Sequence, residues 1–296
     1  MNTRSSALPF IILGVLSVIW GSSFILMKRG LLVFSSTDVA ALRVVISGTV
    51  LLPFAIRAWS SLDKRLLRYL VLCGALGNGI PAVLFTTAQR HLNSSTTALL
   101  NSLTPLFTLL IGVFAFNLVV RRAQVIGVCL GFLGAVALVL AARNEVSAGE
   151  SPWYALLPVI ATICYGLNGN ILSRYLKGVP PMTVNSVAIV SVSLFFLPYL
   201  FWSGFFTQTL SAAQTQPNFT LAFASIIALS VLGTALSNAL FTHLIQISSP
   251  VFSSSVTYLI PIVAMVWGVM DGEHLTALHG IGISIILLGI YLVNKR

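Results

Sequence analysis

The sequence predicts an all-α membrane protein of ten transmembrane helices, built as two inverted five-helix repeats. Three observations lead to this: an extreme composition, a regular succession of apolar segments, and an internal repeat. Of 296 residues, 57% are hydrophobic and only 7% are charged, and the mean hydropathy is +0.99. A soluble domain carries about 25% charged residues, and disordered chains are more polar still. The composition therefore excludes both classes.

Ten apolar segments are long enough to cross a bilayer, which requires about 20 residues per helix. They cover approximately 7–27, 37–57, 67–89, 95–118, 123–142, 152–175, 181–203, 219–243, 247–270 and 276–294. The first is longer than the apolar run of a signal peptide, and no A-x-A cleavage site precedes Lys28 and Arg29. We therefore expect it to be retained. The longest connections, 143–151 and 204–218, are too short to fold alone.

The positive charges predict the orientation of these spans. The net charge is +10, but the basic residues are scattered among apolar runs, unlike the clustered patch of a nucleic-acid-binding protein. With the N-terminus inside, eleven basic residues face the cytoplasm: Arg4, Arg57, Lys64, Arg65, Arg68, Arg121, Arg122, Arg174, Lys177, Lys295 and Arg296. Four face the other side: Lys28, Arg29, Arg90 and Arg143. The positive-inside rule thus favours a multi-pass plasma (inner) membrane protein with both termini in the cytoplasm.

Fixed offsets between similar motifs reveal the repeat. An offset of 156 relates Leu76-Gly77-Asn78 to Leu232-Gly233-Thr234, Leu84-Phe85-Thr86 to Leu240-Phe241-Thr242, and Leu103-Thr104-Pro105 to Leu259-Ile260-Pro261. An offset of 145 relates Trp20-Gly21 to Tyr165-Gly166 and Leu52-Pro53 to Leu197-Pro198. We expect two domains, 1–146 and 147–296. Because five spans is an odd number, the second repeat enters the membrane from the opposite side. Inverted repeats are typical of secondary transporters, whose substrate binds at the repeat interface near the midplane.

An ordered set of motifs resembles the EamA family of the drug/metabolite transporter superfamily. They are Trp20-Gly21-Ser22-Ser23-Phe24, Arg43, Asn93-Ser94-Ser95-Thr96-Thr97-Ala98 through Pro105, Arg121-Arg122-Ala123-Gln124-Val125-Ile126-Gly127, and Pro250-Val251 through Pro261 with Asp271-Gly272-Glu273. The run Asp271-Gly272-Glu273 departs from the common family pattern. The resemblance covers nearly the whole chain. It implies ten helices, alternating access and a central cavity lined by helices 1, 3, 4, 6, 8 and 9. It also implies export of amino acids or similar small metabolites, with some similarity to the aromatic amino-acid exporters.

Two prolines are candidate hinges. Pro105 and Pro261 occupy equivalent positions within their spans. Each removes a backbone hydrogen bond and frees the carbonyl four residues earlier, which belongs to Asn101 in one repeat and to Thr257 in the other. We expect them to act as hinges or to border a cavity. The alternative is a static kink, which is common in membrane helices.

Five residues are candidates for substrate binding. Trp20 and Tyr165 are repeat equivalents in mid-span, and we expect them to face each other and to stack on the substrate. Asn78, Asn101 and Tyr258 are expected to supply hydrogen bonds. The alternatives are ordinary packing for the aromatic residues and interhelical hydrogen bonding for the amides.

Two further amides and one cation are candidates for the same site. Asn168 and Asn170 lie two residues apart on one helix, so at most one of them points into a cavity. Arg43 lies within the second span. The favoured interpretation is an interfacial residue that reaches outward, and the alternative is a contact with a substrate carboxylate.

Several chemistries are not expected. No acidic residue lies at the centre of a span, and no Walker motif, metalloprotease motif or serine elbow is present. We expect no enzyme, no cofactor and no metal, and a monomer or a homodimer. The alternatives are a sugar-nucleotide, sugar-phosphate or drug carrier, or a non-transporting scaffold or intramembrane enzyme. The phosphorylated substrates would require several cations in the cavity, and only Arg43 is at hand.

Overall fold

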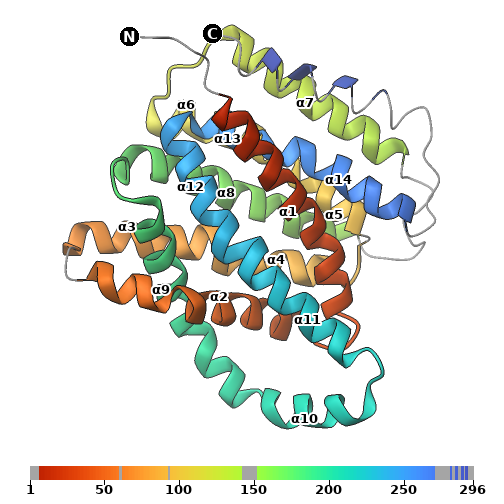
Figure 1. Cartoon of the computed structure of the whole chain (residues 1–296). Helices are drawn as coiled ribbons and strands as arrows, with labels where there is room; N and C mark the ends of the chain where they lie inside the picture. The colour runs from red at the N-terminus through yellow and green to blue at the C-terminus, as the bar shows by residue number, and fades with distance from the viewer. Residues whose placement is uncertain are drawn as a thin grey trace.

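The chain folds into a bundle of apolar helices (Figure 1). The computed structural model describes residues 7–59, 62–92, 94–141 and 152–270, with isolated helical positions at 281, 284, 285, 288, 289, 291 and 292. Six helical segments in this part are long and apolar enough to cross a membrane, and three shorter helices are apolar as well. The predicted all-α membrane class is confirmed. The expected tenth span, 276–294, lies largely outside the described residues.

The first four spans of both halves follow the same order of elements, and the second half has η3 and α10 in addition. The first half contains α1 (Leu8–Gly30), α2 (Ser36–Trp59), α3 (Lys64–Gly74), η1 (Ala75–Gly79), α4 (Ile80–Ala88), α5 (Ser94–Asn101), α6 (Thr104–Phe116) and α7 (Arg122–Ala141). The second half contains η3 (Pro152–Ala155), α8 (Leu156–Tyr175), α9 (Pro181–Trp202), α10 (Phe205–Thr215), α11 (Phe219–Ser230), η4 (Val231–Leu236), α12 (Ser237–Ile247), α13 (Pro250–Ser254) and α14 (Val256–Met270).

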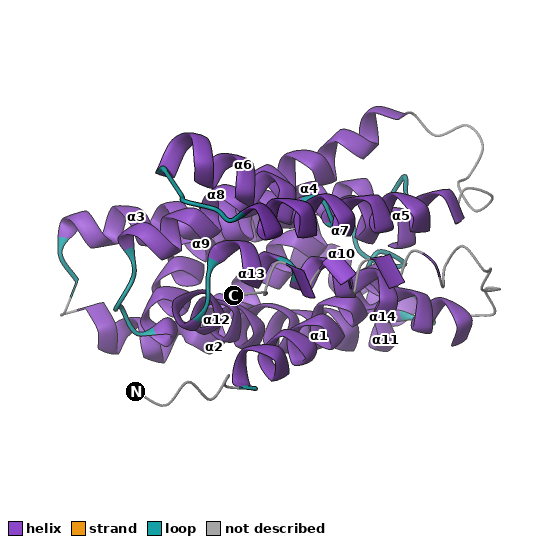
Figure 2. Cartoon of the chain, turned by 90° about the horizontal axis from the view of Figure 1, so that it is seen from above, coloured by secondary structure: helices purple, strands orange, loops and turns teal. Residues whose placement is uncertain are grey.

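The packing of the helices obeys the two-fold relation that the offsets predict. Helix α1 packs on α12 and α14, while its equivalent α8 packs on their equivalents α4 and α6. Helices α2 and α9, which are equivalents of each other, pack together directly. Figure 2 shows α8, α6 and α4 along one side of the bundle and α1, α12 and α11 along the other. Each half therefore completes its core with helices of the other half.

Two spans contain a short π-helical turn at the same repeat position. The turn η1 lies between α3 and α4, and η4 lies between α11 and α12, displaced by the offset of 156. A π-turn inserts one extra residue into an α-helix and is frequent at functional sites. Both turns contain the repeated Leu-Gly motif, so the sequence repeat marks a repeated irregularity of the backbone.

Two further spans are interrupted rather than continuous. The chain leaves the helix at Ser102 and Leu103, between α5 and α6, and again at Ser255, between α13 and α14. Pro105 follows the first break directly, in the first turn of α6, whereas Pro261 lies inside α14. The two prolines are thus not placed alike relative to the breaks, although they are equivalent in the sequence.

The connection 204–218 contains a helix that the sequence analysis did not identify. Helix α10 buries Phe205 and exposes Phe206 and Leu210. It follows Trp202, the exposed last residue of α9. Apolar side chains exposed at the end of a span suit a helix that lies in the membrane interface.

Candidate functional site

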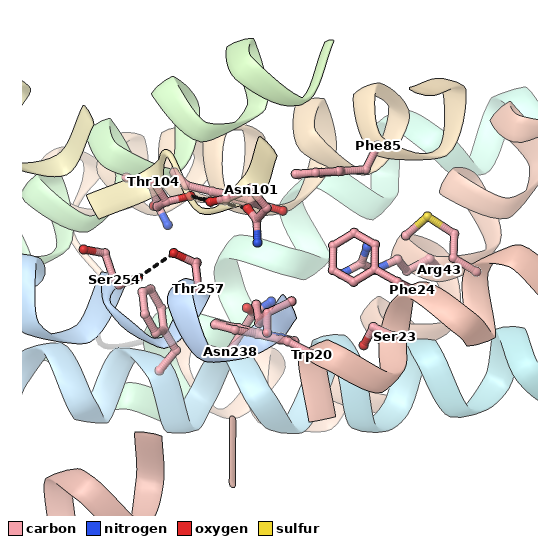
Figure 3. A pocket seen from close by; sticks show the side chains of 16 residues that line it. Trp20, Ser23, Phe24, Arg43, Phe85, Asn101, Thr104, Asn238, Ser254 and Thr257 are labelled. Atoms are coloured by element: carbon pink, nitrogen blue, oxygen red, sulfur yellow. Dashed lines mark hydrogen bonds between the residues drawn. The ribbon is translucent and has the colours of Figure 1, made fainter. Parts of the chain in front are cut away.

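A cavity lies between the two halves of the bundle, with about 760 Å³ of space between the atoms when its open mouth is counted. It is lined from both halves by Trp20, Ser23, Phe24, Met27, Arg43, Gly77, Phe85, Asn101, Thr104, Tyr165, Asn168, Asn238, Phe241, Ser254, Thr257 and Ile260. Figure 3 places Arg43 and Phe85 towards one end of this lining, and Thr104 and Ser254 towards the other. A mostly apolar cavity with a few polar groups is the usual form of a small-molecule site.

Two aromatic pairs form symmetry-related walls of the cavity. The ring of Trp20 packs against Phe241, with centroids 5.2 Å apart. In the equivalent place, Tyr165 stacks on Phe85, with centroids 5.9 Å apart. Because Phe85 and Phe241 are also related by the offset of 156, each wall joins an aromatic residue of one half to one of the other. The structure thus brings Trp20 and Tyr165 to one cavity, each beside a phenylalanine that the sequence analysis did not single out.

The two predicted aromatic residues differ in the polar groups they offer. The indole nitrogen of Trp20 donates to the carbonyl of Gly233 (3.0 Å) and to Ser237 Oγ (2.9 Å), so Trp20 presents only its ring to a ligand. The Tyr165 hydroxyl has no hydrogen-bond partner in the described part of the chain. Tyr165 therefore keeps a free donor and acceptor at the cavity.

Of three amides that the sequence analysis considered, two line the cavity and one does not. Asn101 accepts a hydrogen bond from Thr104 Oγ1 at 3.3 Å and directs its amide nitrogen into the open space (Figure 3). Asn168 also lines the cavity, and its Oδ1 is buried without a hydrogen-bond partner in the described residues. Asn170, by contrast, donates to the carbonyls of Thr108 (2.9 Å) and Gly166 (2.8 Å) and holds two helices together. Of these two neighbours, only Asn168 belongs to the site.

The equivalent π-turns hold two cavity side chains in position. In η1, Asn78 Oδ1 accepts a hydrogen bond from Asn238 Nδ2 at 2.5 Å. In η4, the equivalent residue Thr234 accepts one from Arg43 Nε at 2.7 Å. Asn238 and Arg43 line the cavity, whereas Asn78 and Thr234 do not. Asn78, which we expected to contact substrate, is thus bonded to Asn238 and does not itself line the cavity.

The structure does not bring Tyr258 to the cavity. Its side chain is fully buried, its hydroxyl donates to the carbonyl of Val128 at 3.0 Å, and a Cβ at Gly131 would overlap its ring. Successive residues of an α-helix point about 100° apart, so Thr257 meets the cavity while Tyr258 faces α7. The expectation for Tyr258 is corrected: it packs α14 against α7.

Arg43 lines the cavity. It does not reach outward to the membrane interface, although the sequence favoured that interpretation. It is partly buried, and no carboxylate among the described residues pairs with it. Asp38, on the same helix, instead accepts hydrogen bonds from Ser35 Oγ (2.6 Å) and from the Tyr199 hydroxyl (3.1 Å). A charge inside a span costs about 2.5–3.5 kcal/mol on insertion scales, so a cation without a carboxylate partner among the described residues is a candidate for ligand binding.

The carbonyls that the two prolines leave free are both satisfied by hydroxyls. Thr104 Oγ1 donates to the carbonyl of Asn101 at 2.7 Å, within the first half. Ser102 Oγ donates to the carbonyl of Thr257 at 3.2 Å, across the two halves. The break between α5 and α6 is therefore linked to α14 by a hydrogen bond between the two halves, beside the cavity.

Paired halves, interrupted spans and a cavity at their interface define the class: a helical membrane transporter with repeated halves. The EamA-like transporter family model matches residues 8–140 and 152–295, and the chain belongs to that family. It is a membrane transporter for a small molecule and does not belong to an enzyme family.

Curated relatives match along nearly their whole length. The chain is 24% identical over 285 residues to "Uncharacterized inner membrane transporter YedA" of Escherichia coli K12, covering 94% of this chain and 88% of that one. It is 25% identical to "Probable terminal-alkyne amino-acid exporter" of Streptantibioticus cattleyicolor, with 95% and 92% covered. It is 24% identical to "Probable amino-acid metabolite efflux pump" of Salmonella typhimurium, with 93% and 91% covered.

A solved crystal structure has the same fold. It superposes with a TM-score of 0.73 at 16% sequence identity, and the match covers 99% of this chain and 97% of the other. This similarity concerns the arrangement of the helices, and it extends through both halves of the chain.

Proposed function

We propose that this transporter exports amino acids or similar small metabolites from the cytoplasm by alternating access through the central cavity. The observation that carries the proposal is the cavity between the halves, whose aromatic walls, Trp20–Phe241 and Tyr165–Phe85, are repeat equivalents. Alternating access needs two arrangements of the halves around one site, and a pseudo-two-fold axis through that site supplies them.

The chemistry of the lining suits a neutral or zwitterionic substrate. Asn101, Asn168 and Tyr165 offer hydrogen bonds, and the aromatic rings offer stacking surfaces. Each stacked or edge contact contributes about 0.5–1.5 kcal/mol beyond burial, which suits binding weak enough for release. Two of the relatives carry names that refer to amino-acid export, in agreement with this substrate class.

The charge bias of the loops supports an inner-membrane protein with both termini in the cytoplasm. A relative with 24% identity is named as an inner membrane transporter. A sugar-nucleotide or sugar-phosphate carrier is the second candidate within the superfamily. It is disfavoured because Arg43 is the single cation among the described residues that line the cavity.

The test is counterflow into proteoliposomes that contain the purified protein. Vesicles preloaded with one unlabelled amino acid are offered the same labelled amino acid, in turn for all twenty, and protein-free vesicles serve as the control. We expect accumulation of at least one amino acid with a neutral side chain. Accumulation of sugar phosphates or nucleotide sugars, with none for any amino acid, would establish the second candidate instead.

A further inference from the structure

Arg43 carries an unused set of donors in the cavity. Its Nε donates to Thr234 Oγ1, and the described structure gives its terminal guanidinium nitrogens no hydrogen-bond partner. The phenol of Tyr165, on the same cavity, lies near enough to interact electrostatically with this charge but carries no negative charge at neutral pH. Both acidic residues within the described ranges are engaged elsewhere: Asp38 with Ser35 and Tyr199, and Asp63 with the backbone nitrogen of Leu66. Buried charges in proteins are normally paired. A cation that the protein itself leaves unpaired, on the wall of a ligand cavity, is complementary to an anion from outside.

The position of Arg43 is specified by the fold and is not accidental. Its partner Thr234 belongs to the π-turn η4. The Thr234 hydroxyl accepts from Arg43 and in turn donates to the carbonyl of Leu229 at 3.3 Å. The single bond through Nε fixes the plane of the guanidinium and leaves the two terminal nitrogens side by side. These nitrogens form the fork that binds a carboxylate by two parallel hydrogen bonds.

A second unsatisfied group of opposite character lies on the same cavity. Asn168 is buried, with 9% of its surface exposed, and its Oδ1 has no partner in the described part of the chain. A buried acceptor without a donor is unfavourable by about 1–3 kcal/mol. Its amide nitrogen lies against Gly77, where a Cβ would come within 2.7 Å, so the side chain has little room to turn. An ammonium group would satisfy Oδ1.

We propose that Arg43 is the carboxylate subsite of the cavity and that Asn168 accepts a hydrogen bond from the substrate ammonium. The inference rests on the proposed function, which it narrows to substrates that carry one free carboxylate, with the α-amino-acid zwitterion as the best match. One guanidinium neutralises one negative charge, so dianionic phosphates are poorly matched. Phe85, Phe241, Trp20 and Tyr165 then surround the remainder of the substrate.

The experiment compares acids with their amides on matched variants. The probes are L-phenylalanine, L-phenylalaninamide, which lacks the carboxylate, and phenylacetate, which lacks the ammonium. A ligand that binds only the folded state stabilises it by RT ln(1 + [L]/Kd), so each probe is titrated against the thermal unfolding of the purified protein, and counterflow is measured in parallel. The variants are Arg43→Met, Arg43→Lys and Asn168→Leu. Arg57→Met, an exposed charge on the same helix, is the matched control.

We expect Arg43→Met to weaken L-phenylalanine and phenylacetate by about 10–100-fold, the usual range for a lost hydrogen bond to a charged group, and to leave L-phenylalaninamide unchanged. Arg43→Lys retains part of the affinity because it keeps the charge but not the fork. Asn168→Leu weakens L-phenylalanine and leaves phenylacetate unchanged. Arg57→Met changes none of the three. Size-exclusion profiles establish that each variant is folded.

The outcomes separate the subsite from the proposed function. Equal losses for acid and amide in Arg43→Met, or wild-type protein that binds neither acid, overturn the carboxylate subsite. If that occurs while amino acids are still transported, the proposed function stands without it. If phenylacetate binds through Arg43 while no amino acid is transported, the subsite stands and the proposed substrate class falls.

Discussion

Ser102 donates a hydrogen bond across the molecule to the carbonyl of Thr257, the carbonyl that Pro261 deprives of its helical partner. The bond is 3.2 Å long and joins the break between α5 and α6 to α14. Because the two groups belong to different halves, this bond reports on how the halves meet beside the cavity.

The first prediction concerns this bond. Ser102→Ala should lower the free energy of unfolding by about 1–3 kcal/mol, because it leaves a buried carbonyl unsatisfied. In the Pro261→Ala background the same change should have almost no effect, since the new backbone N–H can bond to Thr257 within the helix. Thermal unfolding of the four proteins of this double-mutant cycle measures the coupling. Equal losses in both backgrounds would show that the bond does not compensate for the proline.

The second prediction concerns the hinges. Pro105→Ala and Pro261→Ala should slow counterflow more than they reduce the yield of folded protein, because a continuous helix would resist the bending that alternating access needs. Pro198→Ala, a proline inside α9 away from the cavity lining, is the control. If both hinge variants transport at the parental rate at equal expression, the prolines are static kinks and not hinges.

The third prediction concerns the aromatic walls. Trp20→Ala or Tyr165→Ala should weaken transport of an aromatic amino acid more than that of threonine, because a small side chain gains little from stacking. Paired counterflow assays with both substrates measure this. Tyr258→Phe removes the bond to Val128 and should lower stability while leaving both substrates equally well transported. An equal loss for both substrates in the wall variants would place the substrate side chain elsewhere.

The fourth prediction concerns the crossing of α3 and α9. A Cβ added at Gly74 would lie 2.1 Å from the backbone oxygen of Ala188. Gly74→Ala should therefore lower the free energy of unfolding by about 1–3 kcal/mol through overpacking. Gly14→Ala, where a Cβ meets nothing within 4 Å, should be neutral or slightly stabilising, because alanine favours the helix by up to about 1 kcal/mol. Unfolding temperatures of the two variants would be expected to move in opposite directions, and a stable Gly74→Ala protein would contradict this packing.

The fifth prediction concerns topology. Asn2 and Asn294 should lie on the cytoplasmic side, because eleven basic residues against four favour that orientation. Alkaline phosphatase and green fluorescent protein, each fused to either terminus, report on which side of the membrane that terminus lies. A periplasmic signal at either end is incompatible with ten spans of this orientation.

The sequence alone determined the class of the molecule, because hydropathy is a property of composition and a bilayer imposes the length of each span. It also determined which positions are equivalent: the offset that relates Gly77 to Gly233 also relates the two π-turns. The same offset relates Phe85 to Phe241, the second residue of each aromatic wall. The repeat therefore showed that these two phenylalanines are equivalent, but the sequence did not show that their side chains face a cavity.

Only the tertiary structure decided which side chains meet the cavity. Arg43, Asn78 and Tyr258 all lie within apolar stretches of the sequence. In the structure Arg43 lines the cavity, Asn78 bonds to the cavity residue Asn238, and Tyr258 packs against α7. Lipid and protein interior are equally apolar, so in a membrane helix the pattern of hydrophobic residues does not distinguish the face towards lipid from the face towards neighbouring helices. Which face is which depends on the rotation of each helix against its neighbours, and that rotation is set by close contacts such as Gly21 on Val263, which exist only once the two halves are packed together.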